Sequence, residues 1–215
     1  MLRAAEGVRL SRVADENEEG YVKQSPDTQG QQTHDAHDLR ALRNALGCYP
    51  TGVAIVTARI PGGRHVGVTV NSFTSLSLDP PLLLFCLARK ANVLAAFDEA
   101  PHFAINVLAH AQHALSSAFA RPTSARIEDW KHVAGDNGCA LLDGALASFE
   151  CRKRECLPGG DHVIFVGEVT AFRCVAAAGP LVFYQGQYGT FARESVDAGA
   201  ETKPPHAGVT APHRG

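Results

Sequence analysis

A run of short polar side chains between Thr69 and Ser77 is the first feature of this sequence that could bind a ligand. Hydroxyl and amide groups, with backbone N–H donors, can bond the edge of a heterocyclic ring and a phosphate without a glycine-rich loop. The same composition is also typical of a polar loop with local Asx and Ser/Thr turns. The segment therefore predicts either a ligand cradle or a plain loop. Six of its nine residues carry such a group: Thr69, Asn71, Ser72, Thr74, Ser75 and Ser77.

A second segment, Cys86 to Asn92, leaves a predicted buried strand and enters a predicted helix. It places Arg89 and Lys90 near the helix N-terminus, where cations oppose the helix dipole. A phosphate bound there would remove the conflict. The alternative is that both side chains are simply solvated, as most arginines and lysines are.

Two further candidates are weak when taken alone. His162 follows Gly160 and Asp161 at a turn-to-strand junction, where a histidine is usually a surface or structural residue. Tyr188 lies in the glycine-punctuated stretch after a predicted strand, and it could pack there as an ordinary aromatic residue.

Several common sites are missing from the sequence. It has no GxGxxG or Walker loop for a nucleotide and no G-x-S-x-G elbow for a hydrolase. None of its six cysteines forms a CxxC pair, and no His or Cys pair has a partner pair at zinc-site spacing. We therefore expect reduced thiols and no metal site.

The charge and hydropathy patterns exclude other classes of partner. The chain has 20 Lys and Arg against 22 Asp and Glu, so it lacks the basic excess of a nucleic-acid-binding protein. Its longest apolar run, Leu82 to Ala88, is far shorter than the ~20 residues of a membrane span. Charges also interrupt the first residues before the apolar region of a signal peptide develops. We expect a cytoplasmic protein without nucleic-acid or membrane partners.

The elements that must position these residues form one predicted domain. Residues 1–36 have few large apolar side chains and many acids and amides, which predicts a disordered leader. Residues 192–215 are rich in Ala, Gly, Pro and Thr without apolar periodicity, which predicts a flexible tail. Residues 37–191 remain as a single domain of ordinary size.

Within this domain, hairpins alternate with short helices. Glycine-containing turns at 61–63 and 158–160 join pairs of predicted strands, and the apolar strand 82–87 is expected to be buried on both faces. This order favours an antiparallel barrel with peripheral helices over a Rossmann sheet. The predicted helices are 38–46, 92–100 and 110–120, and the predicted strands are 53–60, 65–73, 82–87, 103–108, 145–157, 162–175 and 181–184.

Four segments in this order resemble the short-chain flavin reductase family, the NAD(P)H:flavin oxidoreductases that serve two-component monooxygenases. The resemblance extends over about residues 42–191. The segments are YPTGVAIVT (49–57), TVNSFTSLSLDPPL (69–82), GDHVIFVGEV (160–169) and FYQGQYG (183–189).

The resemblance implies a mainly β fold, namely a six-stranded antiparallel Greek-key split β-barrel that binds FMN, with peripheral α-helices. It implies a homodimer with FMN or FAD near the subunit interface, and NADH or NADPH as the hydride donor. The expected partner is a flavin-dependent monooxygenase that receives the reduced flavin. Two alternatives stay open, a flavin carrier without activity on the same barrel and an FMN-dependent oxidase of the same superfamily.

The resemblance also implies roles for individual residues. His162 is expected to orient the nicotinamide, and backbone N–H groups near Asn71 and Ser72 to stabilise charge on the reduced ring. Relatives commonly carry arginine where this chain has Gln185 and Gln187, so a charge-based contact from that loop is not expected. The predicted cofactor-binding residues are Thr69, Val70, Asn71 and Ser72 at the ring and ribityl chain, Ser75, Ser77, Cys86, Leu87, Ala88, Lys90 and Asn92 near the phosphate, and Tyr188.

Overall fold

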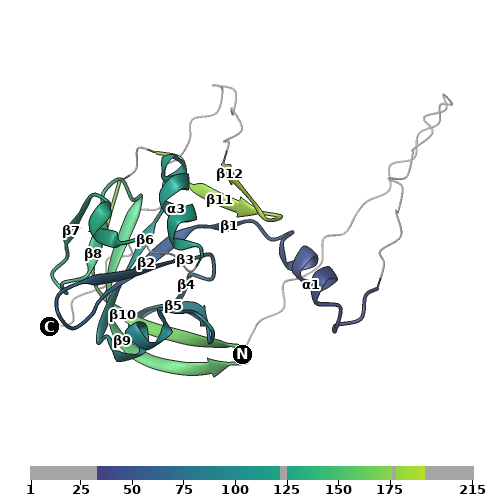
Figure 1. Ribbon diagram of the computed structural model, residues 1–215, viewed down its shortest axis with the longest axis horizontal. Helices are drawn as coiled ribbons and strands as arrows, with labels where there is room; N and C mark the ends of the chain where they lie inside the picture. The colour runs from purple at the N-terminus through teal and green to yellow at the C-terminus, as the bar shows by residue number, and fades with distance from the viewer. Residues whose placement is uncertain (1–32, 122–124, 176–177, 192–215) are drawn as a thin grey trace, which may run out of the picture.

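The computed structural model describes residues 33–121, 125–175 and 178–191 (Figure 1). The predicted leader lies outside the described residues apart from its last four, and the predicted tail lies outside them entirely.

The largest element of the fold is a seven-stranded antiparallel sheet. Its strands follow the order β3-β2-β6-β9-β10-β5-β4. The bounds are β2 Ala54–Arg59, β3 His65–Val70, β4 Thr74–Leu78, β5 Pro81–Ala88, β6 His102–Val107, β9 Ala147–Gly159 and β10 His162–Cys174.

The prediction of a mainly β fold with peripheral helices is confirmed. The predicted count of six strands is not, since this sheet has seven. Among the described strands, β3 and β4 each pair with a sheet neighbour on one side only, so hydrogen bonding does not close the sheet into a barrel.

Both predicted hairpins are present, β2 with β3 and β9 with β10. The turn of the first contains Gly62 and Gly63, whose φ angles of 86° and 85° favour glycine. In the second, the register shifts after Val166 and after Val169, so the long ribbon bends over the core.

The ring of Phe103 lies so close to the backbone of β10 that position 167 must be glycine. A Cβ on Gly167 would lie 2.3 Å from Cζ of Phe103, so only glycine lets β10 approach β6 this closely. Four fully buried rings meet beside it, and Phe85 lies 5.1 Å from Phe165 and 5.0 Å from Phe103 between centroids. Phe97 of α2 (Leu94–Glu99) completes this cluster, which joins β5, β6 and β10.

One buried amide connects three other parts of the fold. Asn106 is fully buried, and its Nδ2 donates to the carbonyls of Ile55 at 3.2 Å and Ala140 at 3.3 Å. Its Oδ1 accepts from the backbone N–H of Leu142 at 3.0 Å and from the Ser148 hydroxyl at 2.9 Å. The amide therefore holds β2, β9 and β8 (Ala140–Leu142) to β6 with its hydrogen-bonding groups satisfied.

Two small sheets and three α-helices surround the main sheet. One sheet has the order β1-β11-β12, and the other pairs β7 with β8. The helix α3 lies between the main sheet and the first small sheet, whereas α1 stands apart from the body (Figure 1). None of the described helices is long and apolar enough to cross a membrane. The remaining bounds are α1 Leu39–Leu46, β1 Thr51–Gly52, η1 His110–Gln112, α3 His113–Phe119, η2 Ile127–Asp129, β7 His132–Ala134, β11 Leu181–Tyr184 and β12 Gln187–Thr190.

The prediction that 82–87 is buried on both faces is wrong. Leu83, Phe85 and Leu87 of β5 are buried, but the alternate residues are only half-buried. Continuous apolar runs are typical of parallel strands covered on both faces, whereas β5 pairs antiparallel with β4 and β10 and packs one face on the core.

The predicted helix 92–100 is also shorter than expected. α2 begins at Leu94, so Arg89 and Lys90 lie in the turn after β5 and not in the first turn of the helix. Residues 74–78 form a strand, β4, so the plain polar loop considered for residues 69–77 does not extend past Phe73. Its residues adopt extended backbone because Thr74 and Ser75 pair with Leu84 and Leu83.

Candidate functional site

Two cavities meet at the C-terminal end of β3, and we call them together the groove. The first, the α1 cavity, has a volume of about 640 Å³ and is lined by α1 and by the turn between β11 and β12. The second, the Tyr188 cavity, has about 540 Å³ and is lined by β3, by Ser117 and by Tyr188. Asn71, Phe183 and Gly186 line both cavities, so the groove is continuous. These sizes lie in the range of small-molecule and cofactor sites.

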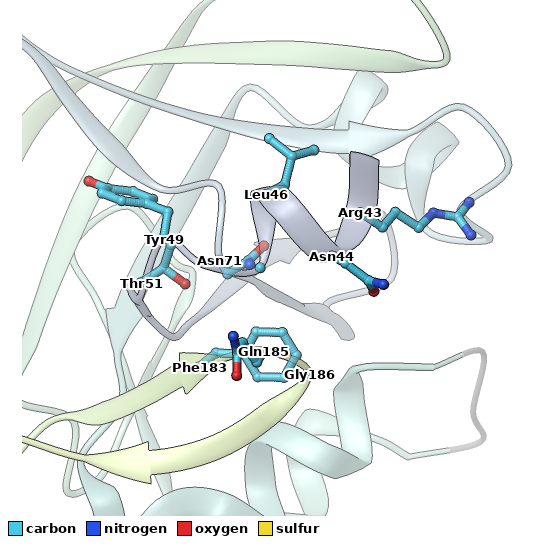
Figure 2. Close-up of a pocket in the computed structure, with 10 residues that line it drawn as sticks. Arg43, Asn44, Leu46, Tyr49, Thr51, Asn71, Phe183, Gln185 and Gly186 are labelled. Carbon is cyan, nitrogen blue, oxygen red and sulfur yellow. The ribbon is translucent and has the colours of Figure 1, made fainter. Parts of the chain in front are cut away.

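Figure 2 shows the α1 cavity between the helix and the β11 turn. Asn44 and Arg43 come from α1 on one side, and Phe183 and Gln185 come from the β11 turn on the other. Thr51 lines the same cavity, and its buried Oγ1 has no hydrogen-bond partner among the described residues. The hydroxyl oxygen is buried, so it does not face the open cavity in this structure, and leaving it without a partner is costly.

Asn71 is positioned by its neighbour Ser72. The pairing of β4 with β5 places Thr74 opposite Leu84, and the same register extended by two residues puts Ser72 opposite Cys86. At that point the Ser72 hydroxyl makes the two hydrogen bonds to Cys86 that the backbone of a neighbouring strand would otherwise make. Its Oγ accepts from the Cys86 N–H at 2.9 Å and donates to the Cys86 carbonyl at 3.2 Å. The chain can thus leave the sheet at Asn71 while the backbone N–H and carbonyl of Cys86 in β5 keep their hydrogen bonds.

The helix α3 holds the other wall of the Tyr188 cavity. Thr69 donates from Oγ1 to the carbonyl of Ser116 at 2.8 Å, and the Ser116 hydroxyl is hydrogen-bonded to the Tyr188 hydroxyl at 2.8 Å. The Tyr188 ring packs edge-on against Phe183 at 5.4 Å and against His113 at 4.4 Å. The phenol ring is therefore fixed as part of the wall.

The turn between β11 and β12 carries Gln185. Its φ of 46° is followed by 79° at Gly186, the pair of positive values that a type I′ hairpin turn needs. The backbone N–H of Gln185 donates to the carbonyl of Gly47 at 3.0 Å, which ties the turn to the end of α1.

His162 lies at the same end of β5 as Ser72, on the opposite edge of that strand. It is the first residue of β10, pairs with Ala88, and its Nδ1 is 2.7 Å from Oδ1 of Asp161. That hydrogen bond lowers the pKa of the Asp161 carboxyl. Arg89 joins the same turn, since its Nε donates to the Gly160 carbonyl at 2.9 Å. His162 is not among the residues that line the groove.

The predicted residues therefore fall into separate places. Thr69, Val70, Asn71 and Tyr188 line the Tyr188 cavity together. Ala88 and Lys90 lie beside the turn that carries His162, while Asn92 lines a separate cavity along β3. Ser75 is exposed on β4, Ser77 accepts the Asp79 N–H at 3.2 Å, and the Leu87 side chain is buried in the core.

Cys86 lies on the half-buried face of β5. Burial raises the pKa of its thiol, and the hydrogen bond from Ser72 opposes that shift only in part. The thiol is therefore neutral near pH 7, and a neutral thiol is a poor nucleophile.

Sequence reasoning missed Arg43, Thr51 and Phe183 as residues of the groove. Thr51 and Phe183 fall in segments that carry the family resemblance, but the residues alone do not show that α1, β1 and β11 come together when the chain folds. The pairing of Thr51 with Phe183 across β1 and β11 is a contact between residues far apart in the sequence.

Comparison with known proteins gives a consistent result. The model of the flavin reductase like domain matches residues 46–192. The reductase subunit of a stachydrine N-demethylase from Rhizobium meliloti is 47% identical over 156 residues, which are 72% of this chain and 66% of that subunit. An NADH-dependent FMN reductase from Agrobacterium fabrum is 46% identical over 72% of this chain and 87% of its own length.

A solved structure agrees in fold. The NADH:FAD oxidoreductase of Streptomyces globisporus, in complex with NAD and FAD fragments, superposes with a TM-score of 0.72 at 35% identity. The match covers 77% of this chain and 99% of that one. This chain thus spans nearly all of the solved reductase but slightly less than two thirds of the demethylase subunit.

The Ser72 bridge generates a first prediction. Replacing Ser72 by Ala leaves the N–H and carbonyl of Cys86 without partners, so the free energy of unfolding should fall by about 1–3 kcal/mol. Urea unfolding measures it, and Ser75→Ala, an exposed serine on β4, is the control that should stay within about 0.5 kcal/mol of the parent. Equal stability of the two variants would contradict the role of the bridge.

Proposed function

The chain belongs to the flavin reductase like family, and on that premise we propose that it transfers hydride from NADH or NADPH to FMN or FAD. The observation that carries the proposal is the groove at Asn71, where the segment Thr69–Asn71 meets the aromatic wall of Phe183 and Tyr188. We take residues 37–191 as the domain that does this work.

The residues of the groove fit a flavin. Asn71 supplies amide donors and an acceptor where the two cavities meet. Phe183 and Tyr188 offer apolar ring surface beside these polar groups. A flat heteroaromatic ring with polar edges needs this combination.

A bound flavin supplies the ring that accepts the hydride, so the protein needs no acid or base of its own. The role of its residues is then to bind the flavin and the nicotinamide and to orient them toward each other. The backbone N–H groups near Asn71 and Ser72 are the donors we assign to the charge that develops at one edge of the reduced ring. Tyr188 and Phe183 would pack against a bound flavin, and α1 would form the facing wall of the groove.

This chain has Gln185 and Gln187 where relatives commonly carry arginine, so these two positions supply no positive charge. Arg43 of α1 lines the same cavity as Gln185, so a guanidinium is available there from another element. This supports binding of an anionic nucleotide despite the two glutamines.

We propose that the open seven-stranded sheet is the split barrel of this family, and that the chain works as a homodimer. α1 has no buried residue, yet Leu39, Leu42 and Leu46 are 61%, 44% and 66% exposed at helical spacing. An eight-residue helix is marginal in water without an apolar partner. Leu46 points away from Phe183 and Gln185 in Figure 2, so a second copy of the chain can cover this face.

The demethylase relative is a reductase subunit, which supports an oxygenase as the recipient of the reduced flavin. Both proteins would work in the cytoplasm, where reduced pyridine nucleotides are supplied.

The activity is tested by mixing the purified chain with NADH or NADPH and with FMN, FAD or riboflavin. We expect loss of absorbance at 340 nm that depends on both nucleotide and flavin. Tight flavin binding without turnover would indicate a carrier and overturn the proposal, as would the absence of any flavin-dependent oxidation.

Two variants separate orientation from binding. His162→Ala should slow hydride transfer about 10- to 100-fold at saturating flavin, because a misplaced nicotinamide loses alignment. Asn71→Ala should instead raise the Kd for flavin about tenfold, the loss of one polar contact. Stopped-flow reduction and flavin fluorescence measure the two effects, with the exposed His110→Ala as control. An unchanged reduction rate in His162→Ala would remove its proposed role.

The dimer has its own test. Sedimentation should give twice the chain mass of 22.8 kDa. Leu42→Glu places a charge in the apolar face of α1 and should shift the protein toward monomer, whereas Arg40→Glu on another face of the same helix should not. A parent protein that sediments as a monomer would show that something other than a second copy covers α1.

A further inference from the structure

Ser116 of α3 holds two residues of the Tyr188 cavity without lining the cavity itself. It is fully buried, and its neighbour Ser117, not Ser116, is part of the lining. Its carbonyl accepts from Oγ1 of Thr69 at 2.8 Å, and its hydroxyl is hydrogen-bonded to the Tyr188 hydroxyl at 2.8 Å. Thr69 lies on β3 and Tyr188 on β12, so one residue of α3 fixes polar groups on two walls of this cavity.

The position of Ser116 in α3 explains why the Thr69 hydroxyl donates to it. Ser116 lies in the last turn of this seven-residue helix, where carbonyls lack a full set of intrahelical N–H donors. A buried carbonyl needs a donor, and the Thr69 hydroxyl supplies one. The only proton of that hydroxyl is therefore committed to α3.

Toward a ligand, the Thr69 hydroxyl can then only accept a hydrogen bond. A hydroxyl has one proton but two lone pairs, and within the described part of the chain no group donates to the Thr69 oxygen. Asn71 and Tyr188 line the same cavity and carry N–H and O–H groups. The cavity thus offers one fixed acceptor together with two side chains that can donate.

This set of groups matches one edge of an oxidised flavin ring. The ring has a single N–H, at N3, and that N–H lies between two carbonyl groups. An acceptor in the protein suits the N–H, and donors suit the carbonyls on either side. A hydroxyl that was free to rotate could donate to another part of the ring instead, so the bond to Ser116 narrows what Thr69 can recognise.

We propose that Ser116 is a positioning residue of the flavin site. Its carbonyl keeps the Thr69 hydroxyl as the acceptor of the ring N3–H, and its hydroxyl holds the Tyr188 phenol in the same cavity. The inference rests on the proposed flavin reductase function. Ser116 touches no ligand in this arrangement and acts only through Thr69 and Tyr188.

Fluorescence titration of the full chain with riboflavin and with N3-methylriboflavin tests the Thr69 contact. The methyl group removes the ring N–H, so the Kd of the parent protein should rise about tenfold. Thr69→Val is nearly isosteric but has no hydroxyl, so its two Kd values should agree within about twofold. Thr69→Ser restores the hydroxyl and should restore the difference. Thr170→Val loses an equivalent bond, to the Glu150 carbonyl and outside both cavities, and as the matched control it should keep the difference.

A double-mutant cycle tests whether Ser116 acts through Tyr188. Ser116→Ala keeps the carbonyl that holds Thr69 and removes only the hydroxyl, so it should raise the Kd for both flavins about threefold and leave their ratio unchanged. Tyr188→Phe should have a similar effect, and the double variant should bind no more weakly than either single variant.

Three results would overturn the proposal: equal Kd values for the two flavins in the parent protein, a difference that persists in Thr69→Val, or additive losses in the Ser116 and Tyr188 variants. A parent protein that shows the N3 difference but oxidises neither NADH nor NADPH would reject the reductase function alone, because the titrations need no catalysis.

Discussion

The hydroxyl of Ser72 is the contact on which the geometry of the groove depends. It satisfies both backbone groups of Cys86 at the position where β4 would otherwise have continued as a strand. Without it, the chain after β3 would have to stay in the sheet to satisfy β5, and Asn71 would lie in a strand. With it, β3 and β5 are joined by one side chain, and the backbone around Asn71 is free to face a ligand. A hydroxyl suits this role because it donates and accepts at one atom.

The two sides of the groove differ in how firmly they are held. The wall formed by β3 belongs to a sheet fixed by the buried amide of Asn106 and by the close contact of Gly167 with Phe103. The opposite wall is formed by α1, which has no buried residue, and by a two-residue turn linked to it through Gln185 and Gly47. Segments with few buried contacts open at low free energy. The groove is therefore rigid on the β3 side and adaptable on the α1 side.

The sequence was sufficient to predict the local secondary structure, but it did not predict which residues form the walls of the groove. Turn glycines at 62, 63 and 160 mark the two hairpins, and the polar run 69–75 marks one wall, because these signals are local. The burial of β5 was misjudged because its apolar run has no alternation to reveal that one face is half-buried. Arg43 carries no signal, and the FYQGQYG segment does not show that Phe183 faces α1, since that placement depends on α1 and β11 meeting across more than a hundred residues.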